Sequence, residues 1–144
     1  MSALTELSLV EAADVIARGE ATSESVTQAA LEAIDAAQPH LNCFISLRAD
    51  ASLEAAREAD RARSSGAQLG PLHGVPLAHK DMFYRAGIVC TCGSKIRADF
   101  VPQITATVLE RLDEAGALHL GGLNMAEFAT GPTGHNVHYG ACRN

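Results

Sequence analysis

The chain has 144 residues and a formal net charge of −6, with 47% hydrophobic and 19% charged residues. This length and composition suit one globular domain with its own core. The acidic balance argues against nucleic acid as a partner, because phosphate binding needs a concentrated basic face. No apolar run approaches a membrane span, and the first residues do not resemble a signal peptide. We therefore expect a cytoplasmic protein without a membrane partner, whose four cysteines are free thiols.

Residues 1–65 predict a helical layer. Ser8 and Glu11 have the spacing of a capping box, so a helix is expected to run from there to Arg18 and to end at Gly19. The other elements expected in this part are a helix that starts at Thr22 or Ser23 and is stopped by Pro39, an extended segment over Leu41–Leu47, and a helix over Ala51–Arg63.

Residues 66–144 predict alternating strands and helices. The expected order is a strand over Gly74–His79, a helix from Thr107 through Ala115, a strand over Ala117–Leu120, a tight turn at Gly121–Gly122, and a short helix opened by Asn124 that runs through Phe128. This order is typical of an α/β protein, so we expect a mixed, partly parallel sheet flanked by helices. Residues 1–65 are then its helical cover and residues 66–144 the start of the α/β core of a single domain.

Lys80 is the candidate catalytic residue. It ends the short apolar strand that contains Val75, Leu77 and Ala78. If that strand carries the side chain into an apolar pocket, burial favours the neutral amine, which can accept a proton from a hydroxyl group. Lys80 would then be half of a Ser–Lys pair. The alternative is a lysine at a solvated strand end, which is the commoner role for such a residue.

A metal site is the competing interpretation of the cysteines and histidines. Thiolates and imidazoles are the ligands that zinc prefers, but the separations of these residues match no standard zinc pattern. We therefore expect no metal and assign core or pocket-wall roles to the five residues concerned, which are Cys90, Cys92, His135, His138 and Cys142.

Three stretches together resemble the amidase signature family. They are Gly70–Asp81, the pair Thr107–Leu112 and Glu114–Ala117, and Gly121–Gly131. The resemblance covers the chain well from about Gly70 to Asn144. It implies that Lys80 is the family's catalytic lysine, which exchanges a proton with a serine in a cis peptide. That serine activates a second, nucleophilic serine, and the reaction needs no metal or organic cofactor.

The resemblance also implies a substrate-binding role for Ala129, Thr130 and Gly131. Neither catalytic serine can be assigned, because the chain contains no Gly-Gly-Ser-Ser-Gly run, and Ser94 is not a substitute for them. The chain is thus expected to be an incomplete, truncated part of the fold and to be inactive by itself.

The sequence therefore predicts the N-terminal part of an amidase that hydrolyses a small-molecule carboxamide through an acyl-enzyme, using a Ser-Ser-Lys mechanism. Two alternatives stay open: an amidotransferase subunit of the same family, and a non-catalytic fragment or interaction module. The expected protein partner is the remaining C-terminal polypeptide or a second copy of the chain in a homo-oligomer.

Overall fold

The structure is a computed structural model that describes residues 3–144. The chain forms two compact units. The first unit contains the chain up to Ala36 together with Arg48–Leu77 and Arg111–Leu120. The second unit contains Ala37–Leu47, Ala78–Glu110 and Gly121–Asn144. Each unit is therefore built from separate stretches of sequence.

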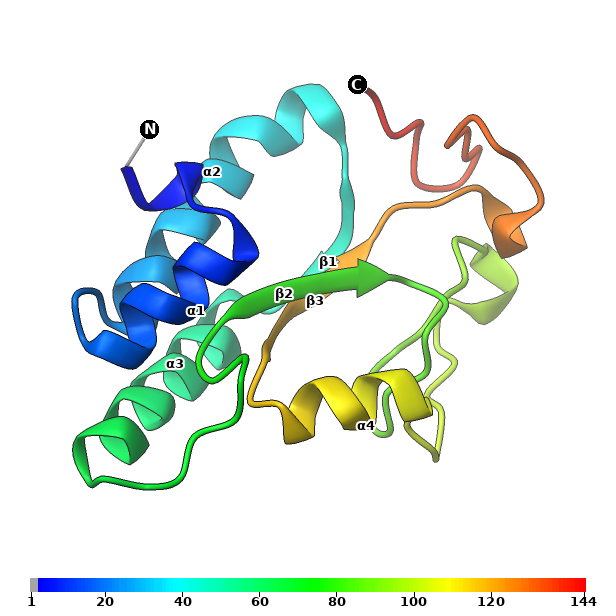
Figure 1. Cartoon of the computed structure of the whole chain (residues 1–144). Coiled ribbons are helices and arrows are strands. Elements are labelled where there is room, and N and C mark those ends of the chain that lie inside the picture. The colour runs from blue at the N-terminus through cyan, green and yellow to red at the C-terminus, as the bar shows by residue number, and fades with distance from the viewer. Residues whose placement is uncertain (1–2) are drawn as a thin grey trace. The chain divides into compact units, whose positions relative to one another are not determined.

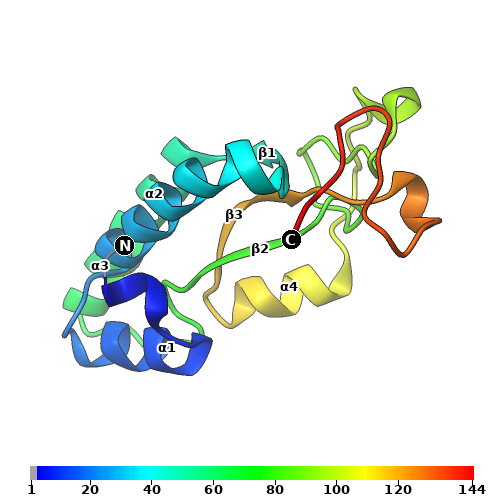
Figure 2. The same cartoon turned by 90° about the horizontal axis from the view of Figure 1, so that it is seen from above.

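The first unit holds most of the helical part of the chain (Figures 1 and 2). Its elements are the 3-10 helix η1 (Ala3–Glu6), the helix α1 (Leu9–Arg18), the main part of α2 (Ser23–Leu41), and α3 (Ala49–Ser64). Its core is built on Ile16, Val26 and Val75, which are at most 6% exposed. Burying one such side chain contributes roughly 1.5–3 kcal/mol.

The capping box of α1 is confirmed. The Ser8 hydroxyl accepts the Glu11 N–H at 3.3 Å, and the Glu11 carboxylate accepts the Ser8 N–H at 2.8 Å. Gly19 ends the helix in the left-handed conformation, at φ +72°. Both ends agree with the prediction because the signals that set them are local in the sequence.

The second helix corrects one expectation, since Pro39 does not stop it. α2 continues to Leu41. Proline lacks the N–H that would bond four residues back, but the residues after it can still donate. The Asn42 N–H bonds the Gln38 carbonyl at 2.9 Å, so the last turn closes around the proline.

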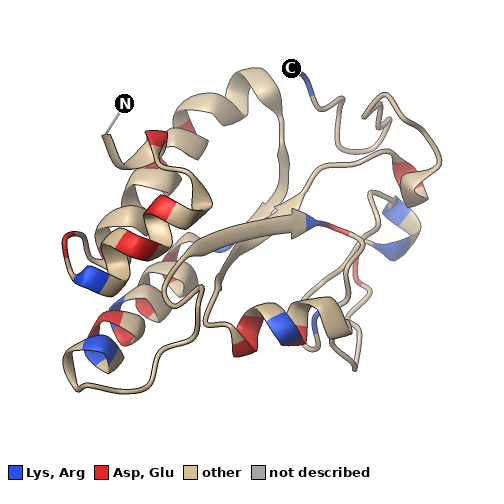
Figure 3. Ribbon diagram, in the orientation of Figure 1, with Lys and Arg blue, Asp and Glu red and all other residues tan. Residues whose placement is uncertain are grey.

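Charged side chains of both signs are interspersed along α3 (Figure 3). Arg57 bonds Glu24 at 2.7 Å and Arg61 bonds Glu54 at 3.1 Å, and the four side chains are 45–62% exposed. Exposed pairs of this kind contribute little to stability, because water and salt screen them. The hydrogen bond from Arg61 is the main cause that lowers the pKa of Glu54. No concentrated basic face forms on this helix.

Three strands form one sheet in the order β1–β3–β2. They are β1 (Phe44–Leu47), β2 (Pro76–Lys80) and β3 (Leu118–Leu123). β1 is antiparallel to β3. β2 is parallel to β3, because the flanking bonds advance in the same direction, from Leu118 N–H to Val75 O and then from Asp81 N–H to Leu123 O. The predicted mixed sheet is therefore confirmed.

Gly121 and Gly122 lie inside β3 and do not form the expected tight turn. They pair with Leu47 and Ser46 of β1. A Cβ on Gly121 would lie 2.1 Å from the Ser46 carbonyl oxygen, and one on Gly122 would lie 3.1 Å from the Asp81 carboxylate. At Gly121 the backbone of β1 approaches too closely for any side chain, and at Gly122 the Asp81 and Ser46 side chains leave little room for one.

The segment after β3 also differs from its prediction. Asn124 opens no helix, and the helical part of this segment is reduced to the 3-10 turn η3 (Glu127–Ala129). The Asn124 amide donates to the Asn42 and Gly140 carbonyls at 2.9 and 3.1 Å. Its Oδ1 atom, which would have to accept an N–H two or three residues further on to cap a helix, instead accepts the N–H of the adjacent Met125 at 2.8 Å.

The two remaining elements are α4 (Thr107–Glu114), close to its expected range, and the 3-10 helix η2 (Lys95–Arg97). Within residues 3–144, no helix is both long and apolar enough to cross a membrane.

Candidate active site

The structure places Lys80 at the carboxyl end of β2, as predicted. The chain turns immediately afterwards, because the Met82 N–H bonds the Lys80 carbonyl at 2.7 Å, while the Asp81 N–H bonds Leu123 O at 3.1 Å. The segments that follow β2 and β3 therefore leave the sheet at the same edge. In α/β proteins, this carboxyl edge is where ligands bind.

One expectation about Lys80 is corrected. The residue is exposed, so the described chain does not enclose its amine in an apolar pocket. The physical reason is its place at the last position of the strand, where the chain turns away. Other groups would have to supply the desolvation that makes a lysine a base.

Asp81 is buried and directs its carboxylate at the loop that contains Thr91. Its Oδ2 atom accepts the Thr91 N–H at 3.0 Å and also the Thr91 hydroxyl. Burial raises the pKa of Asp81, and the Thr91 hydrogen bonds oppose that rise without cancelling it. The Asp81 carbonyl accepts the Cys92 N–H at 2.8 Å. Asp81 thus anchors Cys90–Ser94 beside the end of β2.

Cys90 has the environment of an inert thiol. It is 2% exposed, and burial, followed by the nearby Cys92, raises its pKa to about 11. A thiol with that pKa is protonated at neutral pH, whereas nucleophiles and metal ligands are thiolates. All four cysteines are free, as expected. Across residues 3–144, no three histidine, cysteine or acidic side chains gather as a metal site would require.

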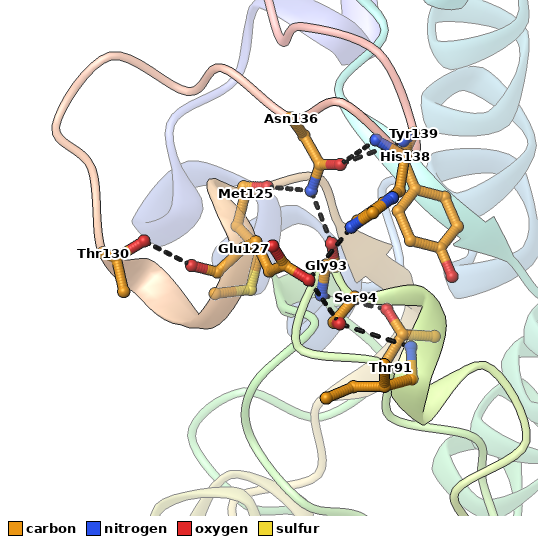
Figure 4. A network of polar contacts seen from close by, with 10 residues as sticks. Thr91, Gly93, Ser94, Met125, Glu127, Thr130, Asn136, His138 and Tyr139 are labelled. Atoms are coloured by element: carbon orange, nitrogen blue, oxygen red, sulfur yellow. Dashed lines mark hydrogen bonds and ion pairs between the residues drawn. The ribbon is translucent and has the colours of Figure 1, made fainter.

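Glu127 lies between Ser94 and His138 (Figure 4). Its Oε1 atom accepts the Ser94 hydroxyl at 2.5 Å and the His138 Nε2–H at 3.0 Å. The Ser94 bond, and then the His138 bond, lower the pKa of Glu127. We call these three residues the Glu127 cluster. Its order is not that of a nucleophilic triad, in which the histidine lies between the serine and the carboxylate.

Ser94 is therefore not a nucleophile in this arrangement. It is fully buried, and its proton is directed at a carboxylate that is itself held by His138. Its oxygen also accepts the Ile96 N–H, which caps η2. No sequence motif assigned a catalytic serine to this position, and the geometry agrees.

The predicted substrate-binding residues lie on a strained turn. Phe128 has φ +50° and Ala129 has φ +57°, so two successive residues with side chains are left-handed. Each such residue costs roughly 1–2 kcal/mol. Ala129, Thr130 and Gly131 are all exposed. Strain of this kind persists only where the surroundings enforce it, and it is frequent at ligand sites.

The loop at Cys92 enforces this turn. The Phe128 N–H bonds the Cys92 carbonyl at 2.8 Å, and the Cys92 N–H bonds the Asp81 carbonyl at 2.8 Å. Two backbone hydrogen bonds thus connect the residue after Lys80 to the residue before Ala129. The structure brings the predicted lysine and the predicted substrate-binding turn onto one continuous backbone network, although they are far apart in sequence.

Asn136 ties three segments of this region together (Figure 4). Its amide donates to the Gly93 and Met125 carbonyls at 2.7 and 2.8 Å, and its oxygen accepts the N–H groups of His138 and Tyr139 at 2.8 and 3.0 Å. The side chain is 5% exposed and uses both donors and its acceptor. It therefore fixes the position of the loop before Ser94 relative to the strand exit and the His138 turn.

Sequence reasoning missed the roles of Glu127, Asn136 and His138. Glu127 was placed only within the short helix expected to run through Phe128, and His138 was assigned a core or pocket-wall role after the metal site was rejected. No local spacing signals the contact between Ser94 and Glu127, because these residues are 33 positions apart. The only indication in the sequence is the number of polar residues after β3, where the chain leaves a buried strand and enters a loop.

A cavity of about 390 Å³ lies elsewhere, in the first unit. Aliphatic side chains from η1, α1, α2 and the start of β2 line it, together with Thr5 and Ser8. None of the described residues that line it is titratable.

Comparison with known proteins identifies the family. The Amidase family model matches residues 25–144. The glutamyl-tRNA(Gln) amidotransferase subunit of Acidothermus cellulolyticus is 44% identical over the whole of this chain, and the Pseudomonas aeruginosa subunit of the same name is 43% identical over 98% of it. The chain spans 28% and 29% of the lengths of these two relatives.

Solved structures give the same result. The peptide amidase of Stenotrophomonas maltophilia is 35% identical, with a TM-score of 0.88, over 99% of this chain and 30% of its own length. Fatty acid amide hydrolase is 26% identical, with a TM-score of 0.91, over 99% of this chain and 25% of its own length. Because the family model matches most of the chain and the fold agrees, the chain belongs to the amidase signature family.

Proposed function

We propose that this chain supplies the catalytic lysine, Lys80, to an enzyme that cleaves the C–N bond of a carboxamide. The observation that carries the proposal is the backbone network from Asp81 through Cys92 to Phe128, which joins the end of β2 to the exposed turn of Ala129–Gly131. A base and a substrate-binding turn on one rigid support satisfy the positional demand of acyl transfer.

In the proposed reaction, the neutral amine of Lys80 accepts the hydroxyl proton of a first serine. That serine takes the proton of a second serine, whose oxygen attacks the amide carbonyl carbon. The C–N bond then breaks, the proton passes to the leaving nitrogen, and an acyl-enzyme ester is left. Water cleaves the ester by the same proton route in reverse. The two serines belong to polypeptide other than residues 1–144, so the chain alone is expected to be inactive.

The exposed position of Lys80 is consistent with a site in which this chain supplies the lysine and other polypeptide supplies the serines. An amine at a strand end is accessible to a serine presented by further polypeptide, and the arrival of that polypeptide would also desolvate it. Ala129, Thr130 and Gly131 are proposed to contact the substrate from their strained turn. No metal or organic cofactor has a step in this mechanism, and the expected substrate is a small amide.

The test uses the protein expressed from its full coding sequence. Lys80→Ala should lower amide turnover on the order of 10²-fold or more, because a proton-transfer group is lost. Lys80→Arg should be as inactive, because a guanidinium does not become neutral. The matched control is Lys95→Ala, which removes another exposed lysine of the same unit and should leave turnover unchanged. Near-normal turnover in folded Lys80→Ala would refute the proposal.

A second candidate is an amidotransferase subunit, which transfers the released ammonia to the substrate of a partner protein. The names of the curated relatives favour this alternative, whereas the solved peptide amidase favours hydrolysis. Turnover of simple amides by the purified protein without any partner would support the hydrolase. Turnover that appears only when a partner protein is added would support the amidotransferase. No turnover in either assay would indicate a non-catalytic module.

A further inference from the structure

The turn at Phe128 and Ala129 needs an external support because its own backbone disfavours it. The Ala129 N–H bonds the Ala126 carbonyl at 2.9 Å, and the Thr130 N–H and hydroxyl both bond the Glu127 carbonyl, at 3.1 and 2.7 Å. These bonds close the turn on itself. They do not explain why Phe128 and Ala129 keep the left-handed conformation. Contacts from outside the turn must therefore hold it.

The loop Cys92–Ser94 provides two such contacts. The Cys92 carbonyl accepts the Phe128 N–H at 2.8 Å, and the Ser94 hydroxyl donates to the Glu127 carboxylate at 2.5 Å. Both bonds come from the same short loop and reach adjacent residues of the turn. One fixes the backbone and the other fixes the side chain that precedes it, so the turn cannot rotate about either residue alone.

His138 holds the Glu127 carboxylate from another segment, at 3.0 Å and on the same Oε1 atom. Asn136 fixes both neighbours of this arrangement, since it bonds Gly93 on the loop and the N–H of His138. Gly93 leaves no room for adjustment, because a Cβ there would lie 2.7 Å from the Asn136 amide nitrogen. Glu127 is thus the point at which three separate segments meet.

We propose that Glu127 is a positioning residue that sets the Phe128–Ala129 turn in its substrate-binding conformation through its bonds to Ser94 and His138. This inference rests on the proposed function, because it assigns the turn to amide binding. Glu127 itself has no role in proton transfer. Its carboxylate is occupied by the serine and the histidine, and its effect reaches the substrate only through the conformation of residues 128–131.

The experiment compares Glu127→Ala with Glu127→Gln in the protein expressed from its full coding sequence. Alanine removes both acceptor bonds, and kcat/KM for an amide should fall about 10–100-fold, mainly through KM, because a misplaced binding element costs that much. Glutamine keeps an Oε1 acceptor for Ser94 and His138 and should restore most of the loss. A glutamine variant as impaired as the alanine variant would overturn the proposal.

Hydrogen exchange gives a readout that does not depend on turnover. Glu127→Ala should speed exchange of the Phe128 and Ala129 amides at least about tenfold relative to the amides of α1, as expected for local opening. Ser52→Ala is the control for damage elsewhere in the fold, since Ser52 is fully buried and bonds two carbonyls in the first unit. In this control, exchange of the Phe128 and Ala129 amides should quicken no more than the loss of global stability accounts for.

The two readouts separate the possible failures. If Lys80→Ala keeps its turnover while Glu127→Ala still loosens the turn, the proposed function fails and the support by Glu127 stands. If Lys80→Ala is inactive but Glu127→Ala changes neither KM nor exchange at Phe128 and Ala129, the positioning role is refuted and the proposed function stands.

Discussion

Two serine–glutamate pairs in this chain use the same chemistry in opposite settings. Ser8 and Glu11 lie three residues apart at the start of α1 and are exposed. Ser94 and Glu127 lie 33 residues apart, and Ser94 is completely buried. In both pairs the serine hydroxyl donates to the carboxylate, and that serine is the largest cause that lowers the pKa of the glutamate.

The difference lies in what each pair organises. The Ser8–Glu11 pair satisfies free N–H groups at one helix end, a local task that helix geometry specifies. The Ser94–Glu127 pair joins two loops and supports a strained turn. Losing the first pair should fray one helical turn, whereas losing the second should release the segment to which we assign substrate binding.

The largest expected effect comes from Asn136, which holds the loop before Ser94 in place beside Glu127. Asn136→Ala leaves two carbonyls and two N–H groups without their partner in a buried place, so the free energy of unfolding should fall by about 2–4 kcal/mol. Urea denaturation measures this loss. The control is Gln28→Ala on α2, where an exposed amide bonds Glu32 and the change should stay within about 0.5 kcal/mol. Equal losses in the two variants would contradict the comparison.

The accuracy of the sequence predictions follows the same division. The bounds of α1 were correct because its capping box and its terminal glycine act within one turn of the helix. The mixed sheet also followed from the order of strands and helices. Gly121 was misassigned to a turn because its need for glycine comes from the carbonyl of Ser46, on a strand far earlier in the chain. A requirement set by a distant strand leaves no mark in the neighbouring sequence.

The candidate site shows the same limit. The position of Lys80 at a strand end followed from its apolar neighbours, and its role in catalysis stays a prediction, as do the roles of Ala129, Thr130 and Gly131. Its exposure did not follow, because burial depends on which segments pack over a strand end. The joint role of Glu127, Asn136 and His138 could not be found by pattern, since each bonds at least one residue that only the fold brings near.

The next effect in size compares the two serines directly. Ser94→Ala removes a fully buried hydroxyl that bonds both Glu127 and the Ile96 N–H, and it should lower the free energy of unfolding by about 1–3 kcal/mol. Ser8→Ala removes a helix cap and should cost about 0.5–2 kcal/mol, at the lower end for an exposed helix start. The part of the chain in which hydrogen exchange quickens distinguishes the two variants more clearly. Exchange should quicken near Phe128 in the first variant and in the first turn of α1 in the second, and the reverse pattern would refute the assignment.

The smallest effect is a change in titration. The pKa of Glu127 is lowered in the folded protein, so its bonds stabilise the fold above the ordinary glutamate pKa of 4.5, and that stabilisation is lost as the pH falls through the lowered value. Ser94→Ala should therefore raise the pKa of Glu127 toward 4.5 and leave that of Glu11 low, as carboxyl carbon NMR shifts can measure. Asp81 provides a check of opposite sign. Burial raises its pKa, so the stability it contributes is present below pH 3.8 and is lost as the pH rises through the raised value. If Glu127 in Ser94→Ala kept its low pKa, the histidine would be its dominant partner, and the parallel between the two serine–glutamate pairs would fail.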